Sequence, residues 1–318
     1  MRLLRILSKF LCVLILAVAA VLFGVYRYYD QEKRALDDLE RQSADARSFG
    51  GSYIRLGAGV THYELGGPKD ARTVVLVHGF SVPYFIWDPT FDALTAAGFR
   101  VLRFDLYGRG WSDRPDVTYN PDLFDQQLLQ LLGALNITEP IDIVGLSMGG
   151  PITVNFAKRH PANVRKVVLY DPAYGKGFPP PWQLRAPFLG DFVMAVLRAP
   201  AMPASQRDDF VHPERYPDYF PKYTSQMRYK GFRRAVCSTI LNFLSVDNTG
   251  AFAELGKSGK PVLLIWGRAD QTVPFSVSDD VRKAIPQAEF HAIDDAAHLP
   301  FYEHPEIVNP ILIEFLRR

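Results

Sequence analysis

Ser147 stands in the pattern Gly145-x-Ser147-x-Gly149, which is typical of a serine used as a nucleophile. An apolar, β-prone run (141–144) precedes it, and a helix-forming run (152–160) follows at once. This order predicts a strand–turn–helix elbow that exposes the serine hydroxyl, with glycines where a Cβ would clash with the neighbouring strand and helix. The positive end of the helix dipole would then face the serine, where a developing oxyanion is stabilised.

A serine hydroxyl becomes a good nucleophile only when a base takes its proton and an acid orients that base. His298 is the best base, because it lies in a loop of small residues after a predicted strand. Asp270 lies in the turn after the preceding predicted strand, and Asp171, which ends an earlier one, is the alternative acid. Since the carboxyl ends of parallel strands share one edge of a sheet, we expect these groups to meet Ser147 there. We favour Asp270, because Asp171 also fits a plain strand-ending turn.

An oxyanion hole needs two backbone donors, and the sequence offers one on each side of the expected site. Met148 follows the nucleophile and supplies the first N–H. A buried strand (73–77) ends in His78-Gly79, so the N–H of Phe80 is the expected second donor. His78 is then a structural support of that loop and not a base. The alternative is a plain strand-to-loop turn in which Gly79 only provides flexibility.

The elements that must position these residues follow a strand–helix pattern. Residues 52–66 alternate like a small hairpin, and strands and helices then alternate, which predicts an α/β fold with a mostly parallel sheet. The stretch 175–258 interrupts this pattern with nine prolines between Pro179 and Pro221 and with many aromatic residues. We expect a helical cap inserted after the sixth strand, which would cover Ser147 with an apolar pocket. The alternative is a second helical layer of the core.

Taken together, these motifs resemble the α/β-hydrolase superfamily, in particular its single-domain lipases, esterases and meta-cleavage-product hydrolases, over about residues 52–318. The resemblance is carried by His78-Gly79-Phe80, Phe104-Asp105-Leu106-Tyr107-Gly108-Arg109-Gly110-Trp111-Ser112-Asp113, Gly145-Leu146-Ser147-Met148-Gly149, Gly267-Arg268-Ala269-Asp270 and His298. Ser147 sets aside relatives with an aspartate nucleophile, such as dehalogenases and epoxide hydrolases. The resemblance implies the following roles: nucleophile Ser147, orienting acid Asp270, base His298, and oxyanion donors Phe80 and Met148. It implies no metal and no organic cofactor.

Two positions favour ester hydrolysis over carbon–carbon hydrolysis. Meta-cleavage hydrolases typically look like Gly-Asn-Ser-Met-Gly at the elbow and place a tryptophan after the catalytic histidine, whereas this chain has Leu146 and Leu299. We therefore expect a serine ester hydrolase acting on small lipid-like or other apolar esters such as monoacylglycerols. The alternatives are a carbon–carbon hydrolase of the meta-cleavage type and a non-catalytic ligand receptor on the same scaffold, against which an intact triad counts.

The N-terminus has the composition of a membrane-spanning segment. Three basic residues precede an unbroken apolar run over 10–26, which would span roughly 26 Å as a helix, enough to cross a thin hydrocarbon core. We expect an uncleaved single-pass membrane anchor, because the run continues past a small-residue cleavage pattern at 17–19. A cleaved signal peptide and a buried helix of the globular domain are the alternatives. With three basic residues before the run and four after it, the charges assign no orientation.

After the anchor, residues 30–47 are predicted to form a polar helix that acts as a stalk and ends at Gly50-Gly51. The predicted organisation is anchor 1–26, stalk 27–51, hydrolase core 52–174 and 259–318, and cap 175–258. Within the cap, a basic cluster is interpreted as a solvated helix face, with anionic lipid headgroups as the alternative partner; its members are Arg228, Lys230, Arg233 and Arg234.

Composition excludes several classes of protein. The net charge of +2 gives no sign of nucleic-acid binding. The two cysteines, Cys12 and Cys237, provide no disulfide framework. With 48% hydrophobic residues, the chain of 318 residues has ample material for a large core.

Overall fold

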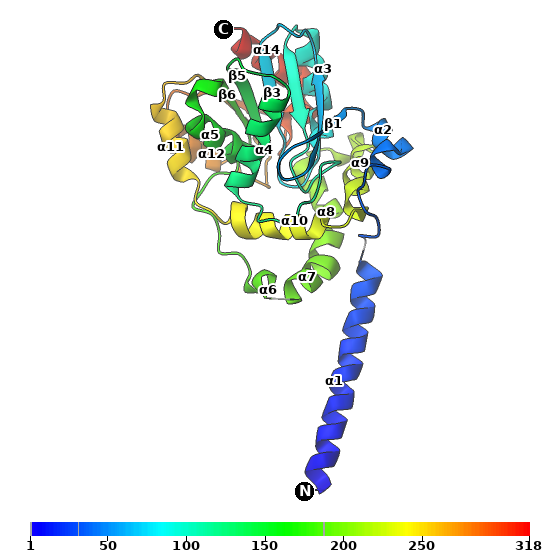
Figure 1. The fold of residues 1–318 in the computed structure, drawn as a ribbon. Helices are drawn as coiled ribbons and strands as arrows, with labels where there is room; N and C mark the ends of the chain where they lie inside the picture. The colour runs from blue at the N-terminus through cyan, green and yellow to red at the C-terminus, as the bar shows by residue number, and fades with distance from the viewer. Residues whose placement is uncertain (1, 31, 187) are drawn as a thin grey trace.

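The computed structural model describes residues 2–30, 32–186 and 188–318, and within these an eight-stranded sheet forms the centre of the molecule (Figure 1). The strand order is β1-β2-β4-β3-β5-β6-β7-β8. The strands are β1 (Ser52–Arg55), β2 (Val60–Gly66), β3 (Thr73–Val77), β4 (Arg100–Phe104), β5 (Ile141–Leu146), β6 (Val164–Tyr170), β7 (Val262–Gly267) and β8 (Glu289–Ile293). Strand β2 is antiparallel to β1 and β4, and the other pairs are parallel. The predicted hairpin and mostly parallel sheet are confirmed.

Successive residues of the central strands enter two hydrophobic cores, one on each face of the sheet. In β3, Val74 and Leu76 belong to the core that includes α3 and α14, whereas Val75 and Val77 belong to the core that includes α4 and α5. Because both faces are covered, these strands are continuous apolar runs without polar alternation. The covering helices are α3 (Asp88–Ala96) and α14 (Pro305–Arg317) on one face, and α4 (Pro121–Ala134), α5 (Gly149–Arg159), α11 (Thr249–Lys257) and α12 (Val277–Ala284) on the other.

A helical cap follows β6, and no strand falls within the described residues of the segment 175–258. Its last helix, α11, packs against α5 and α12 and so belongs to the layer that covers the sheet. The cap proper therefore ends before Thr249. Its elements are α6 (Trp182–Arg185), α7 (Leu189–Val193), η4 (Met194–Arg198), α8 (Ala199–Ser205), η5 (Gln206–Asp209), η6 (Pro213–Arg215), α9 (Tyr219–Ser225), η7 (Gln226–Arg228), α10 (Phe232–Thr239) and η8 (Ile240–Leu244).

The N-terminal helix α1 (Arg2–Tyr29) projects from the globular body (Figure 1). Its part Ile6–Tyr29 has a mean hydropathy of 2.7 over its most apolar window, none of which is buried against the body. The helix is thus long and apolar enough to cross a membrane. The alternative of a buried helix of the globular domain is excluded by this exposure.

The segment after α1 does not form the predicted polar helix. Regular structure in it is limited to the short helices η1 (Glu40–Gln42) and α2 (Ala44–Ser48). We call residues 30 and 32–51 the linker. The linker lies along the cap, where Arg34 N–H donates to the carbonyl of Arg228 and Lys230 N–H donates to the carbonyl of Arg34. The prediction of a helical stalk over 30–47 is therefore wrong, because partners far away in sequence replace the local helical hydrogen bonds.

The arginines of the basic cluster are held by acidic residues. Arg233 is buried, and its Nη1 lies 2.6 Å from Asp30 Oδ1. Arg228 pairs with Asp45 of the linker at 2.5 Å, and Arg234 pairs with Asp116 at 3.0 Å. The interpretation of this cluster as a solvated face is therefore wrong for Arg233, which instead docks the linker on the cap.

Candidate active site

Ser147 occupies the sharp turn between β5 and α5. Its φ angle of 52° lies in the left-handed region that non-glycine residues rarely adopt. Neighbouring backbone holds it there: Ser147 N–H donates to the carbonyl of Tyr170 at 2.9 Å, and the Ser147 carbonyl accepts from Gly150 and Ala173. The predicted strand–turn–helix elbow is therefore formed. The strain stored in such turns is characteristic of functional sites.

The glycines of the elbow are required by close backbone contacts. A Cβ on Gly145 would lie 2.4 Å from the carbonyl oxygen of Gly149. A Cβ on Gly149 would lie 2.3 Å from the carbonyl oxygen of Val77 in β3. Helix α5 can therefore approach the sheet closely enough to direct its N-terminus at Ser147 only when both positions lack a side chain.

His298 and Asp270 are brought together from loops after β8 and β7. His298 Nδ1 lies 2.8 Å from Asp270 Oδ2, and both side chains are buried. The second carboxylate oxygen, Asp270 Oδ1, accepts hydrogen bonds from the N–H groups of Thr272 and Val273 at 2.8 and 2.9 Å. These two donors fix the carboxylate. Because the carboxylate bonds Nδ1, Nε2 is the imidazole nitrogen that is not bonded to Asp270.

The pKa of His298 reflects two opposing influences. Burial lowers it, but the charge of Asp270 and the hydrogen bond to Asp270, together with the charge of Asp209, raise it above the ordinary value of 6.5. The net increase means that the imidazolium is stabilised, which is the form a general base reaches after it has taken a proton.

Asp171, the alternative acid, lies in the same cluster but is bonded differently. Its Oδ1 accepts from Gly267 N–H at 2.8 Å, and its Oδ2 has no hydrogen-bond partner among the described residues. One carboxylate oxygen of Asp171, one carboxylate oxygen of Asp270 and one imidazole nitrogen of His298 all lie within 4.8 Å of one another. Burial, and then the charge of Asp270, raise the pKa of Asp171 well above its usual range. The protonated form of Asp171 is thus favoured.

Ser147 and His298 line one cavity of about 1130 Å³, closed on one side by the cap. The hydroxyl of Ser147 makes no hydrogen bond to His298 among the described residues, although contacts of this kind often tighten only when substrate binds. Most of the wall is apolar, and the cap contributes η4 and α8 to it. The apolar lining residues are Phe80, Val82, Leu146, Met194, Leu197, Ala201, Met202, Phe210, Val211, Pro213, Val236, Ile240, Ala269, Ala297 and Leu299.

The predicted oxyanion donors, Phe80 and Met148, follow β3 and Ser147 respectively. In the described part of the chain, neither N–H donates a hydrogen bond, so both remain available to a ligand. His78 supports the Phe80 loop, because its Nδ1 contacts the Gly79 carbonyl at 2.8 Å and its Nε2 accepts from Leu106 N–H at 2.9 Å. Burial lowers the pKa of His78 to about 4, so it stays neutral in this role.

Arg109 also holds the loop that carries Phe80, a contact that the sequence did not reveal. Its Nε donates to the carbonyl of Phe80 at 2.7 Å, and its Nη2 donates to Thr239 Oγ1 in the cap at 2.9 Å. The guanidinium is fully buried and pairs with no carboxylate among the described residues, and burial lowers its pKa to about 10. Arg109 belongs to the Gly108-Arg109-Gly110 stretch quoted above, but the motif does not show which carbonyl it meets.

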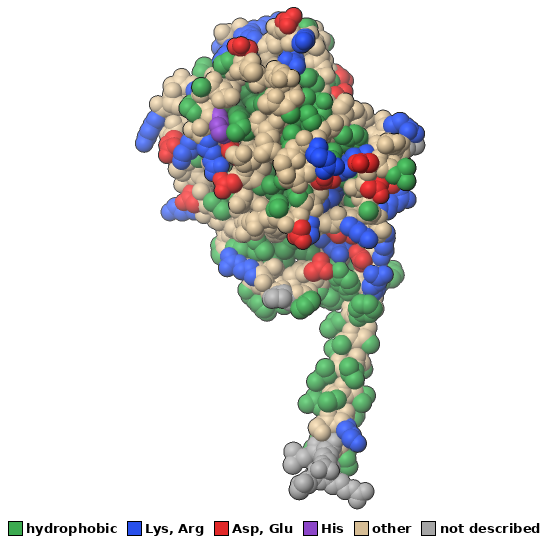
Figure 2. Space-filling model, in the orientation of Figure 1, with side chains coloured by type: hydrophobic (Ala, Val, Ile, Leu, Met, Phe, Trp, Pro, Cys, Tyr) green, Lys and Arg blue, Asp and Glu red, His purple; other side chains and the backbone are tan. Residues whose placement is uncertain are grey.

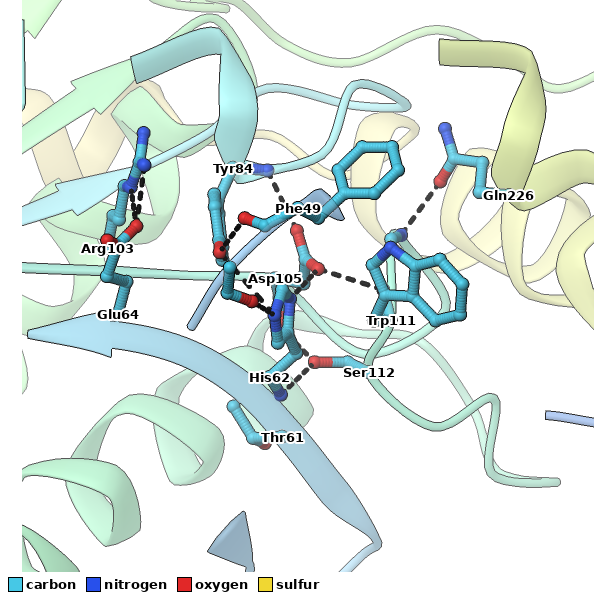
Figure 3. A network of polar contacts seen from close by, with 12 residues as sticks. Phe49, Thr61, His62, Glu64, Tyr84, Arg103, Asp105, Trp111, Ser112 and Gln226 are labelled. Atoms are coloured by element: carbon cyan, nitrogen blue, oxygen red, sulfur yellow. Dashed lines mark hydrogen bonds and ion pairs between the residues drawn. The ribbon is translucent and has the colours of Figure 1, made fainter. Parts of the chain in front are cut away.

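A buried polar network around Asp105 fixes the surroundings of this loop (Figure 3). The Asp105 carboxylate accepts from His62 Nδ1, Tyr84 N–H and Trp111 N–H, each at 2.8 Å. Gln226 of the cap joins the network by accepting from Gly110 N–H and donating to the Ser81 carbonyl, both at 2.8 Å. The network thus ties the hairpin, the segment after Phe80 and the cap to a single carboxylate.

Asp209 is the second residue that sequence analysis missed. It belongs to η5 of the cap, where its carbonyl accepts from His298 N–H at 3.1 Å and its Oδ1 accepts from Thr272 Oγ1 at 2.6 Å. Its side chain is buried at the wall of the cavity. Nothing in the local sequence distinguishes Asp209 from the neighbouring Asp208, because only the folding of the cap over the core gives it its partners.

Comparison with known proteins agrees with this geometry. A family model described as the alpha/beta hydrolase fold matches residues 72–305. The chain belongs to the α/β-hydrolase family. Among curated relatives of this α/β hydrolase, a 2-hydroxy-6-oxononadienedioate/2-hydroxy-6-oxononatrienedioate hydrolase of Cupriavidus pinatubonensis is 31% identical, over 77% of this chain and 87% of the relative. Lipase 1 of Psychrobacter immobilis is 28% identical, over 76% of this chain and 75% of the lipase.

Among solved structures, the enol-lactonase of Burkholderia xenovorans LB400 has the same fold. It superimposes with a TM-score of 0.73 at 24% sequence identity, covering 84% of this chain and all of the lactonase. The curated relatives of this α/β hydrolase therefore include a dienedioate hydrolase and a lipase.

Proposed function

We propose that the protein is a serine ester hydrolase that forms an acyl-enzyme at Ser147. The observation that carries this proposal is the 2.8 Å contact between His298 Nδ1 and Asp270 Oδ2, in a pair whose histidine lines the same cavity as the elbow serine. A serine becomes a nucleophile when a histidine beside it is oriented by a buried acid. No part of this chemistry requires a metal or an organic cofactor.

In the proposed reaction, His298 Nε2 takes the proton of Ser147 Oγ as the oxygen attacks the ester carbonyl. The N–H groups of Phe80 and Met148 stabilise the oxyanion of the tetrahedral intermediate. The intermediate expels the alcohol, which receives the proton from His298. Water, deprotonated by the same histidine, then attacks the acyl-enzyme and releases the acid and Ser147.

The substrates we propose are lipid-like or other apolar esters such as monoacylglycerols. The cavity of about 1130 Å³ is large enough for an acyl chain, and its wall carries mainly aliphatic, methionine and phenylalanine side chains. The lipase among the relatives supports the same substrate class.

We also propose that α1 is an uncleaved membrane anchor. The exposed apolar surface of Ile6–Tyr29 supports this proposal, since the most apolar window of this helix is not buried against the body. Carbonate extraction of the full-length protein tests it: an anchored protein stays in the membrane pellet with its original N-terminus. Recovery in the soluble fraction, with a new N-terminus near Ala20, would identify a cleaved signal peptide instead.

Labelling with a fluorophosphonate probe tests the enzymatic proposal. We expect the purified protein to be labelled at Ser147, and the Ser147→Ala variant to remain unlabelled. Ser205, which also lines the cavity, provides the matched control, because Ser205→Ala should be labelled as the unchanged protein is. A series of p-nitrophenyl esters then ranks acyl-chain lengths. Absence of labelling in the unchanged protein would refute the proposal and favour a non-catalytic receptor.

A carbon–carbon hydrolase is the second candidate, favoured by the relative that is 31% identical and acts on a dienedioate. Such a substrate needs cationic partners for its carboxylates. The arginines of the cavity wall, Arg198 and Arg207, are both exposed, so the buried part of the pocket offers apolar contacts instead. Turnover of a meta-cleavage dienoate at a higher kcat/KM than any p-nitrophenyl ester would decide for this candidate.

A further inference from the structure

The cap carries a group of large apolar side chains that it does not bury. Trp182 of α6 is 67% exposed, Phe188 just before α7 is 92% exposed, and Leu197 of η4 is 63% exposed. Leu189, at the start of α7, is 37% exposed. We call these four residues the cap face. Figure 2 shows hydrophobic side chains gathered at the end of the body from which α1 leaves.

Many other large apolar residues of the cap are packed, although Phe178 and Val246 are 45% and 43% exposed. Phe210, Tyr219, Tyr223 and Phe232 are all buried in the main hydrophobic core. Large apolar groups that stay in solvent on one face commonly mark a contact with a partner or a membrane. The exposed cap face therefore indicates contact with a partner outside the globular body.

The position of α1 identifies that occupant. The last turns of α1 touch the cap: Tyr26 Oη donates to Asp191 Oδ2 of α7 at 2.6 Å, and α1 packs against η4. Arg233 of α10 reinforces this contact, since its Nη1 lies 2.6 Å from Asp30 Oδ1 and its Nε lies 3.6 Å from Asp191 Oδ1. The elements that carry the cap face are thus fixed beside the end of the apolar helix.

The same elements form a wall of the catalytic cavity. Met194, Leu197 and Arg198 of η4 line the cavity that also contains Ser147. Leu197 contributes both to this wall and to the cap face. The elements α6 and η4 also carry the exposed cations Arg185 and Arg198, which are suitable partners for lipid phosphate groups. The short helix η4 therefore connects the cap face with the wall of the cavity that contains Ser147.

We propose that the cap face seats in the interfacial layer of the lipid bilayer that α1 spans, and that the cavity receives its ester directly from that layer. The inference rests on the proposed anchor and deepens the proposed function. It explains why the pocket wall and the membrane-proximal end of α1 share η4. Aromatic residues such as Trp182 are favoured in the interfacial layer because they are apolar with one polar group.

Trp182 provides a direct test. The chain has four tryptophans, and the other three, Trp87, Trp111 and Trp266, are buried. Full-length protein is reconstituted into phosphatidylcholine vesicles with or without brominated acyl chains, which quench only nearby indoles. We expect clear quenching in brominated vesicles that disappears in Trp182→Phe. Equal quenching of the two proteins would overturn the proposal, as would failure of the protein to remain with the vesicles.

A kinetic experiment tests the route of the substrate. In the double variant Trp182→Ser and Phe188→Ser, we expect hydrolysis of a vesicle-dissolved ester to fall at least fivefold, while hydrolysis of a water-soluble ester stays within twofold. Ile307→Ser on α14, which removes a 46% exposed apolar side chain from another surface, should change neither rate. Equal losses on both esters would overturn the proposed route. An inactive but Trp182-quenched protein would refute the hydrolase proposal alone, since quenching needs no catalysis.

Discussion

Asp171 and Asp270 lie close together beside His298, yet only Asp270 is bonded to the histidine. Burial, and then the charge of Asp270, raise the pKa of Asp171 well above its usual range. The two acids therefore have different proposed roles. In the proposed reaction Asp270 orients the base, whereas Asp171 accepts a hydrogen bond from Gly267 N–H.

Replacement of the two acids should therefore have unequal effects. In Asp270→Asn, we expect kcat to fall by roughly 10³–10⁴, because the imidazole loses its orientation and its countercharge. Asp171→Asn should keep most activity, since an amide resembles the neutral acid in shape and hydrogen bonding. Steady-state kinetics with a soluble ester measures both. A larger loss in Asp171→Asn would show that the acid assignment is wrong.

The pH dependence of the reaction should report His298. Because its pKa is raised above 6.5, the neutral base becomes available only at higher pH, so kcat/KM should rise with pH through an inflection above 6.5. In Asp209→Asn, a nearby negative charge is removed, the pKa of His298 falls, and the inflection should move to lower pH by up to about 1 unit. An inflection that stays in place would show that Asp209 does not act on the histidine.

The elbow predicts a contrast between two glycines. Gly145→Ala places a Cβ 2.4 Å from the Gly149 carbonyl, so we expect about 1–3 kcal/mol of destabilisation and a large loss of activity. At Gly133 of α4, no atom lies within 4 Å of an added Cβ, and Gly133→Ala should stabilise the protein by about 0.5–1 kcal/mol. Denaturant unfolding of both variants in the same detergent measures the difference. Similar unfolding midpoints would contradict the packing described for the elbow.

Arg109→Lys should impair catalysis more than folding. Lysine keeps the charge but cannot bond both the Phe80 carbonyl and Thr239, so the oxyanion loop is displaced and kcat should fall by about 10- to 100-fold. Arg114 is also buried but bonds the carbonyls of Ser112 and Gly110, away from Phe80. Arg114→Lys should therefore cost stability with a smaller change in kcat. Equal kcat values in the two variants would argue against a positioning role for Arg109.

The docked linker predicts resistance to protease. Arg233→Gln removes the ion pair with Asp30, so trypsin should cleave the linker at Lys33 or Arg34 several times faster than in the unchanged protein. Arg234→Gln, which removes an exposed pair with Asp116 and a hydrogen bond to the Arg114 carbonyl, both outside the linker, should be cleaved at the unchanged rate. Time courses followed by mass spectrometry identify the cut sites. No change in Arg233→Gln would mean that other contacts hold the linker.

Much of the site could be predicted because its chemistry lies in local patterns. The elbow depends on glycines within two residues of Ser147, and the positions of Asp270 and His298 follow from the strands that precede them. The linker could not be predicted in the same way. Its acidic residues suit a helix locally, but Glu32 instead accepts from Gly231 and Arg233 N–H groups in the cap. Contacts between residues about 200 positions apart leave no periodic trace in the sequence.

Asp209 and Arg109 show the same limit at the active site. Each makes a contact between the cap and the core, Asp209 with His298 N–H and Arg109 with Thr239. The short helices of the cap follow one another without the long periodic pattern that reveals a helix of the core. The sequence therefore indicates that a cap is present, but not which of its residues reach the catalytic groups.

The docking of the linker also determines how the rate of an anchored enzyme would depend on the concentration of its substrate. A disordered linker of this length would allow the body to lie roughly 25 Å from the end of α1 in many orientations. The ion pairs of Arg233 and the backbone bonds of Arg34 instead hold the body in one pose. Such an enzyme would meet its substrate within the plane of the membrane. Its rate should follow the mole fraction of ester among the surrounding lipids, so that adding inert lipid dilutes the substrate even when the amount of ester per millilitre is unchanged.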